Sequence, residues 1–155
     1  MARDSETVRV IAQNRRAKHT YLLLEELECG VVLTGTEVKS LRAGRASIAE
    51  AFGRIQDGEL WLYGATIPEY AFGNIHNHVP SRPRKLLVQR RQVDAWERAV
   101  REKGITLVPL ALYFKGHLVK VQMALVRGKK LHDKRQSEKK KHADREIGRA
   151  VGRRR

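Results

Sequence analysis

The sequence predicts a mainly β fold, a small antiparallel β-barrel flanked by two or three short helices. Two hairpin signals, Asp57-Gly58 and Lys115-Gly116, each lie between apolar segments of strand length. Residues 119–125 place an apolar side chain at every second position, which is the period of a strand with one buried face. Several short strands joined by tight turns, with few helical segments between them, favour a closed or nearly closed barrel.

The N-terminal third should form a strand, a loop and a hairpin. We expect the first strand around residues 8–11 and a polar, basic loop over residues 14–19. Two apolar runs follow, at residues 21–27 and 31–33. Gly30 lies between them, and its permissive backbone predicts a hairpin turn there.

A short helix is expected between the glycines at 35 and 44. Val38 and Leu41 are spaced three apart on one face, while Lys39 and Arg42 share another. Gly44 is well placed to end this helix, because glycine accepts the left-handed conformation that follows many helix C-termini.

The rest of the body alternates hairpins with a loop and a second helix. Residues 52–63 should be a hairpin, residues 68–85 a long proline-containing loop, and residues 94–104 a helix. Residues 106–125 should form a second hairpin whose outgoing strand is bulged or at an edge, because Pro109 cannot donate to a strand ladder. We expect both tryptophans, Trp61 and Trp96, to be core residues.

Charge divides the chain into a barrel domain (1–126) and a basic C-terminal tail (127–155). The chain carries 32 Lys and Arg against 17 Asp and Glu, a net charge of +15, and the tail alone holds 13 basic and 4 acidic residues. So few apolar side chains cannot offset the entropy of ordering the tail. On a helix, four tail residues would also form one repelling line at intervals of four: Lys141, Arg145, Arg149 and Arg153. We therefore expect the tail to be disordered when free and to order on a polyanion.

A sequence pI near 10.5 favours nucleic acid as that polyanion. An anionic membrane is the rival, but the sequence has no run of about 18 apolar residues and the tail lacks the Trp, Phe and Leu face that an interfacial helix needs. The first residues contain no apolar leader segment, and Cys29 is the single cysteine. Both observations suggest a cytoplasmic protein without disulfides.

Catalytic and metal signatures are weak. His76 and His78 form a His-x-His pair without further ligands at metal-binding spacing, and Cys29 has no base placed to activate it. A nuclease would need a carboxylate cluster to hold its metal, and the pattern contains none. We expect no cofactor, no metal and no enzymatic activity, with an RNA-processing enzyme as the rival class.

Two basic segments are candidates for RNA contact. In the first, Arg16 and Lys18 would pair with phosphates while Asn14 and His19 bond base or sugar edges. Its alternative is a solvated loop, with Tyr21 packing in the core. The second is the Lys39 face of the 35–44 helix, for which a plain solvated face is the alternative.

Six segments together resemble the SsrA-binding protein (SmpB) family, in the family's order. They are Asn14 to Tyr21, Leu27 to Gly30, Gly35 to Gly44, Arg84 to Leu87, Leu107 to Leu110 and Gly128 to Arg135. The Glu-Val-Lys-Ser-Leu-Arg helix and the Gly-Lys-Lys and Asp-Lys-Arg motifs that begin the tail are the most specific. Cys29 departs from the alanine common in the family, and beyond Arg135 the resemblance is one of character only.

The resemblance implies a β-barrel with OB-fold character and a function in trans-translation. A member of this family binds the tRNA-like part of transfer-messenger RNA (tmRNA, SsrA RNA) and delivers it to stalled ribosomes. Its tail engages the decoding centre and the mRNA channel. The implied partners are tmRNA, the small ribosomal subunit and, through tmRNA, elongation factor Tu, with the protein itself a monomer. The alternative is a general OB-type RNA-binding or ribosome-associated protein.

The same resemblance, read with the charge pattern, assigns two sets of residues. The expected RNA-binding residues are Asn14, Arg16, Lys18, His19, Tyr21, Glu28, Lys39, Arg42, Arg84, Lys85, Lys120, Lys129 and Lys130. The expected ribosome-binding tail residues are His132, Asp133, Lys134, Arg135, Lys141, Arg145, Arg149 and Arg153.

Overall fold

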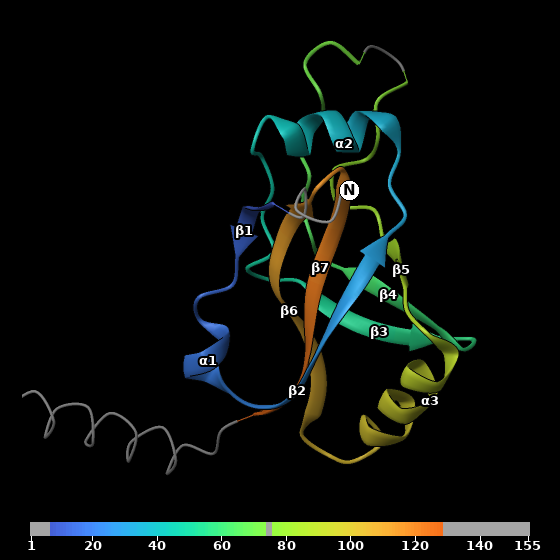
Figure 1. Ribbon diagram of the computed structural model, residues 1–155. Helices are drawn as coiled ribbons and strands as arrows, with labels where there is room; N and C mark the ends of the chain where they lie inside the picture. Colours follow the sequence, from blue (N-terminus) through green and yellow to red (C-terminus); the bar gives the residue numbers. More distant parts are fainter. Residues whose placement is uncertain (1–6, 74–75, 129–155) are drawn as a thin grey trace, which may run out of the picture.

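The computed structural model describes residues 7–73 and 76–128, which form seven strands and three helices (Figure 1). In chain order the elements are β1 (Val8–Gln13), α1 (Ala17–Thr20), β2 (Tyr21–Val31), α2 (Gly35–Arg42), β3 (Phe52–Gln56), β4 (Glu59–Tyr63), β5 (Arg84–Leu87), α3 (Arg90–Ala99), β6 (Ile105–Lys115) and β7 (Leu118–Gly128).

The strands close into a ring. Their order is β1-β6-β3-β4-β5-β2-β7, and β6 also pairs with β7, so β2 to β7 form a closed barrel. β1 pairs with residues 111–115 of β6, on the same edge of that strand with which β3 pairs at Leu107. Each of these pairings is antiparallel. The small antiparallel barrel expected from the sequence is thus confirmed.

Apolar side chains from all parts of the barrel fill its interior. Val121 and Met123 of β7 are fully buried there, and α2 contributes Leu41. Helix α3 packs Val93 and Trp96 against the same cluster. Each large apolar side chain that is removed from water stabilises the fold by about 1.5–3 kcal/mol. Figure 1 shows α2 across one end of the barrel and α3 beside the other.

One seam of the barrel depends on a glycine. Gly53 of β3 pairs with Leu107 of β6, the one residue pair that joins these strands in the described part of the chain. A Cβ atom at Gly53 would lie 2.9 Å from the Leu107 Cβ and 2.7 Å from the Met123 Cε. The two strands can approach closely because position 53 has no side chain.

Several local predictions are confirmed. Asp57 and Gly58 have φ of 51° and 74°, so both central residues of the β3–β4 turn are left-handed, as a two-residue hairpin of this type requires. Gly44 has φ of 80° directly after the C-cap of α2. The register of β6 and β7 shifts between Pro109 and Ala111, which is the expected bulge.

The hairpin predicted at Gly30 is wrong. β2 runs without a break through Gly30, which pairs with Lys120 of β7 on one side and Leu87 of β5 on the other. A Cβ atom at Gly30 would lie 3.2 Å from the Leu87 Cβ, so this glycine allows a close side-chain contact rather than a turn. It also follows that Cys29 is a buried strand residue and not a turn residue.

Several element boundaries also differ from the prediction. The expected loop at residues 14–19 contains α1, and the expected helix at 94–104 begins at Arg90 and ends at Ala99. The second hairpin turns at Gly116 and His117, one residue later than expected. Gly104, with φ of 87°, lies in the connection after α3 and not at its last turn.

A second, smaller core covers part of the outer barrel face. Ala124 and Val126 of β7 point outward, yet both are fully buried against Ala17 of α1 and Val108 of β6. The expectation of one buried and one open face along β7 is therefore wrong at these positions. Trp61 is the opposite case: it lies half-buried on the outer face of β4, while Trp96 is a core residue as expected.

Candidate nucleic-acid interface

Helix α1 holds basic side chains at the barrel surface by burying one small residue. Ala17 is 1% exposed in the second core, whereas its neighbours Arg16, Lys18 and His19 are exposed. The helix is only four residues long and lacks a side-chain cap, so its position depends on packing and not on its own propensity. The Asn14 amide beside it donates to the carbonyl of Pro109 over 3.3 Å, which links this turn to β6.

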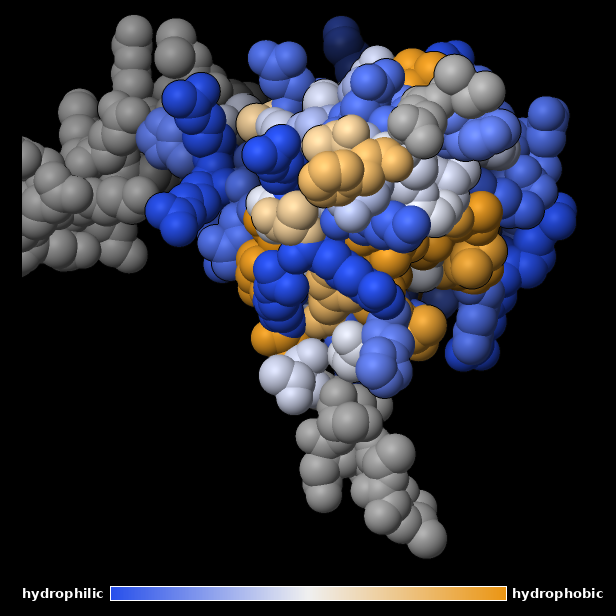
Figure 2. Space-filling model, turned by 90° about the horizontal axis from the view of Figure 1, so that it is seen from above, coloured by the Kyte–Doolittle hydropathy of each residue, from blue (hydrophilic) through white to orange (hydrophobic). Residues whose placement is uncertain are grey.

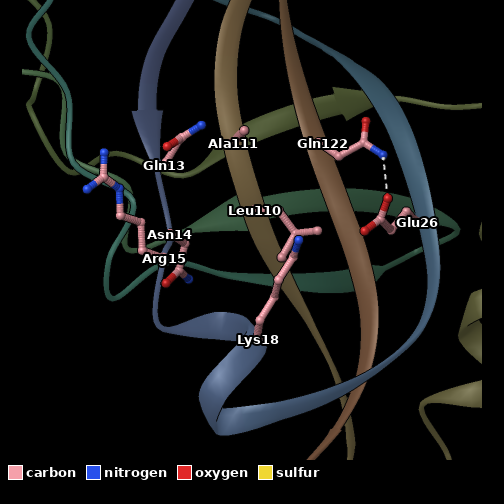
Figure 3. Close-up of a pocket in the computed structure, with 8 residues that line it drawn as sticks. All are labelled: Gln13, Asn14, Arg15, Lys18, Glu26, Leu110, Ala111 and Gln122. Carbon is pink, nitrogen blue, oxygen red and sulfur yellow. Dashed lines mark hydrogen bonds between the residues drawn. The ribbon is translucent and has the colours of Figure 1, made fainter. Parts of the chain in front are cut away.

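A hollow of about 400 Å³ lies between this turn and the outer faces of β2, β6 and β7 (Figure 3). On its far side the Gln122 amide donates to Glu26 across a Nε2–Oε2 distance of 3.4 Å. The hollow therefore has cations on one wall and amide and carboxylate groups on the other, which suits a sugar or base edge beside a phosphate. Its lining residues are Gln13, Asn14, Arg15, Lys18, Glu26, Leu110, Ala111 and Gln122.

Glu28 continues this polar surface along β2. The Tyr113 hydroxyl donates to Glu28 with an oxygen–oxygen distance of 2.5 Å, and the Lys115 Nζ lies 3.3 Å from the other carboxylate oxygen. Gln122 lies opposite Glu28 in the β2–β7 register, and Lys120 is two residues further along the same face. Glu28 is thus held by defined donors and is not a free surface acid.

The surroundings of Glu28 and Tyr113 keep the carboxylate ionised and the phenol neutral. The hydrogen bond from Tyr113 lowers the pKa of Glu28, and Lys115 lowers it further against the opposing effect of burial. Burial raises the pKa of Tyr113, and the Glu28 carboxylate raises it further. Glu28 is therefore an anion and Tyr113 a neutral donor at neutral pH, so the carboxylate can accept from a base amino group despite the basic surroundings.

Helix α2 presents the second candidate surface at the other end of the barrel. It begins with a capping box in which Thr34 and Glu37 bond each other's backbone, and it exposes Lys39 and Arg42 as predicted. The Lys39 Nζ lies 5.5 Å from the centre of the Tyr70 ring, and Arg9 donates to the Arg42 carbonyl over 3.0 Å. Seen from above α2, this end is largely hydrophilic with small apolar patches (Figure 2).

An ion cluster below α2 fixes its orientation. Glu37 is fully buried and accepts hydrogen bonds from the guanidinium groups of Arg82 and Arg84, the latter over 2.6 Å. Arg84 also donates to the carbonyls of Ala65 and Pro80. With 1% of its surface exposed, Arg84 is a structural residue, so the prediction that it contacts RNA is wrong.

Lys85, the neighbour of Arg84, keeps partial access to solvent. Its side chain is half-buried and its Nζ lies 3.0 Å from the Glu59 carboxylate, so only part of the Lys85 side chain is free to contact RNA. Lys129, Lys130 and the predicted tail residues from His132 to Arg153 lie outside the described residues.

Gln13 and Arg15, which line the hollow, were not predicted as site residues, and neither were four polar residues of the strands beside it: Glu26, Tyr113, Lys115 and Gln122. The last four join the network only because β2 is one long strand paired with β7. The predicted turn at Gly30 split that strand and hid the register. The alternation of Glu26 and Glu28 with apolar Leu27 and Cys29 was the available signal.

The histidine pair has a structural explanation at His78. This ring is buried between the Thr36 hydroxyl at 2.9 Å and the Ile67 carbonyl at 2.7 Å. The described part of the chain holds no group of three His, Cys, Asp or Glu side chains that would hold a metal ion. It also contains no helix long and apolar enough to cross a membrane.

Comparison with known proteins identifies the family. The model of the SmpB protein family matches residues 11–153. The chain belongs to the SmpB family. It is 54% identical to the SsrA-binding protein of Acidothermus cellulolyticus over 99% of this chain and 96% of that protein, and 52% identical to the SsrA-binding protein of Thermobifida fusca over 95% and 92%.

A solved structure of an SmpB relative supports the same assignment. It is described as "tmRNA-SmpB: a journey to the center of the bacterial ribosome". The similarity has a TM-score of 0.66 and 44% sequence identity, and it covers 80% of this chain and 91% of the solved one. The family resemblance predicted from the six sequence segments is confirmed.

Proposed function

We propose that this SmpB-family chain is the RNA-binding adaptor of trans-translation: it binds the tRNA-like part of tmRNA and delivers it to stalled ribosomes. The observation that carries the proposal is the match of the whole barrel, in sequence and in structure, to SsrA-binding proteins and to an SmpB solved with tmRNA. The basic chain, with its net charge of +15, is consistent with an RNA partner.

The tmRNA-binding face in this proposal extends from α1 to the middle of β2 and β7. Arg16 and Lys18 contact phosphates, while Asn14 and His19 contact base or sugar edges beside the 400 Å³ hollow. Tyr21 packs on the second core below them. Further along this surface, Glu28 accepts from a base amino group and Lys120 supplies another cation. Lys39, Arg42 and the edge of Lys85 extend the contact beyond this face.

The proposal assigns no chemistry to the protein, so we infer that it is not an enzyme. Lys129 and Lys130 extend the RNA contact, and the tail residues from His132 to Arg135, with the cationic line from Lys141 to Arg153, engage the decoding centre and mRNA channel of the small ribosomal subunit. Elongation factor Tu joins through tmRNA and not through a site on the barrel. The protein acts as a cytoplasmic monomer.

Relative affinity tests the proposal most directly. We expect the full chain to bind tmRNA well above tRNA and duplex RNA when all three are compared at one salt concentration. An affinity ratio near one would instead favour a general OB-type RNA-binding or ribosome-associated protein. In the same mixture with magnesium, labelled tmRNA should stay intact. Cleavage of the RNA would instead indicate an RNA-processing enzyme.

Charge reversal locates the face. Lys18→Glu and Lys120→Glu should each weaken tmRNA binding and reduce the log–log salt slope by about one unit for each phosphate that the protein no longer neutralises. Arg98→Glu on α3 is the matched control, because Arg98 is an exposed cation away from this face. Equal losses of affinity in all three variants would mean that only net charge matters.

A further inference from the structure

An aromatic strip lies on the outer face of β3 and β4. Phe52 and Tyr63 are directly opposite each other in the antiparallel register, and their rings stack with centroids 5.7 Å apart and planes 12° apart. Trp61 is the next outward residue on β4, opposite Arg54 of β3. Three aromatic side chains therefore share one surface of a two-stranded ribbon.

These rings do not belong to either core. The inward positions of the same strands are filled by Ile55, Leu60 and Leu62, and no ring of the strip is among the described residues of the two core clusters. Phe52 is 43% exposed, while Tyr63 and Trp61 are half-buried. The inner side chains already satisfy the packing of this ribbon, so core packing does not account for three aromatic residues on the outside.

Cations accompany the rings. Arg54 is exposed beside Trp61, and no acidic side chain of the described residues pairs with it. Lys85 lies next to Trp61 on the neighbouring strand β5. At the Phe52 end the strip opens into a hollow of about 290 Å³ between α1 and residues 49–52, with Arg16 among its lining residues. The rings thus have cations beside them, although Glu50 also lines this hollow and Glu59 pairs with Lys85.

We propose that this strip is a second RNA-binding surface, on which unpaired bases of a single-stranded RNA stack on Phe52, Tyr63 and Trp61. Stacking on exposed aromatic faces with cations beside them is the general mode of single-strand binding, and it tolerates any base. Arg54 neutralises a phosphate beside Trp61. The Phe52 ring, already stacked on Tyr63, offers a preordered face to an incoming base.

The strip lies away from the β2–β7 part of the proposed tmRNA-binding face, although its Phe52 end borders the α1 part of that face. In the closed ring of six strands, β4 lies three positions from β7, so the outer faces of these two strands point to opposite sides of the barrel. Figure 1 shows β3 and β4 behind β6 and β7. One barrel can thus hold tmRNA on the β7 side and a second, single-stranded RNA on the β4 side.

Single-stranded RNA fits this surface better than a protein partner. Aromatic and arginine side chains also occur in protein interfaces, so the preference for RNA depends on the charge of the whole chain, which is +15 and favours a polyanion. A duplex would bury its base faces and offer only phosphates, which leaves the rings without a role.

Two oligomers of equal charge test the stacking. The full chain is titrated with a ten-nucleotide single-stranded adenosine RNA and with an abasic oligomer of the same length. Cations anywhere in the chain bind both alike, because both carry the same phosphates. We expect the base-containing oligomer to bind about tenfold tighter or more, which is the effect of one or more stacked bases. Equal binding would overturn the proposal.

Variants then locate the contact. Phe52→Leu should reduce the preference for bases by about tenfold, whereas Leu118→Ala, which changes an exposed apolar residue of β7, should leave it unchanged. Thermal melting of each variant checks that the fold is kept. The RNA should also quench the fluorescence of Trp61, and the quenching should vanish in Trp61→Phe, because the remaining Trp96 is 2% exposed.

Binding to tmRNA separates this proposal from the proposed function. Phe52→Leu should keep tmRNA affinity within about twofold, and Lys18→Glu should keep the preference for bases. If Phe52→Leu abolishes tmRNA binding, the strip is part of the tmRNA-binding face and no second surface exists. If the strip cross-links to a protein of the translation machinery and shows no preference for bases, a protein partner replaces RNA.

Discussion

Removing the buried carboxylate of Glu37 should be one of the most damaging single changes in the barrel domain. Glu37→Gln keeps the size of the side chain but leaves the Arg84 guanidinium, which is 1% exposed, without its counter-charge. Breaking a buried pair by removing one partner costs about 3–5 kcal/mol, because a desolvated charge is left uncompensated. For a domain of this size, that corresponds to a fall in Tm of roughly 10–20 °C.

Glu59→Gln provides the matched control. It breaks the Lys85–Glu59 pair, whose side chains are 39% and 44% exposed, and exposed pairs contribute about 1 kcal/mol or less. Urea unfolding of both variants, followed by circular dichroism, gives the two free energies directly. If Glu37→Gln loses no more stability than Glu59→Gln, our assignment of Glu37 as the clamp beneath α2 is refuted.

The pH dependence gives an independent check. Burial alone would raise the pKa of Glu37, but hydrogen bonds from Arg82, Thr34 and Arg84 outweigh it and lower the pKa below the usual value of 4.5. A carboxyl whose pKa is lower in the folded state contributes stability above its unfolded pKa and loses it as pH falls through the folded value. The gap between wild type and Glu37→Gln should therefore be full at neutral pH and shrink below pH 4.5.

Four further outcomes are expected. Reversing the charges of Lys39 and Arg42 together should weaken tmRNA binding in a filter assay, while stability changes by about 0.5 kcal/mol or less per site, because both are exposed; unchanged affinity would place the RNA surface elsewhere. Cys29, whose pKa burial raises to about 12, should react with iodoacetamide at pH 8 only after denaturation. Tyr113→Phe should raise the pKa of Glu28 toward its ordinary value in an NMR titration, because the main hydrogen bond that lowers it is gone. A chain ending at Gly128 keeps every described strand and should still bind isolated tmRNA, but it should fail to support tagging on stalled ribosomes; loss of tmRNA binding would contradict this division.

The β3–β4 turn could be predicted from the sequence because a tight turn depends only on the residues that form it. Asp57-Gly58 needs two left-handed residues, and few residue pairs other than Asn-Gly and Asp-Gly satisfy that cheaply. Gly30 shows the limit of the same reading. A glycine that turns the chain and a glycine that admits a neighbouring Leu87 look identical in sequence, since the difference lies in a strand more than fifty residues away.

The candidate site shows the same division. The segments that carry the family resemblance placed Asn14, Lys18, Lys39 and Arg42 on the surface, as the structure does. In the sequence Arg84 and Lys85 are adjacent cations that look alike. Because side chains alternate along β5, Arg84 is buried beneath the end of the barrel and Lys85 points outward.

Tyr113 and Gln122 could not be predicted as partners of Glu28. Their positions depend on the register of β2 against β7, which side-chain packing across the whole barrel decides.

The pairing of β2 with β7 also dictates when this protein can fold. Tyr21 meets Gly128, about a hundred residues later in the chain, and the ring cannot close until that last strand exists. During synthesis β2 therefore emerges early, and its edge toward β7 stays unpaired while four other strands and two helices are made. Closure by such a distant pair is entropically costly, and until it occurs the edge of β2 that β7 covers is free to pair with other chains. A copy whose synthesis stops before residue 118 has no β7 and cannot complete its barrel, so the adaptor that we propose for stalled ribosomes would itself be lost to stalling.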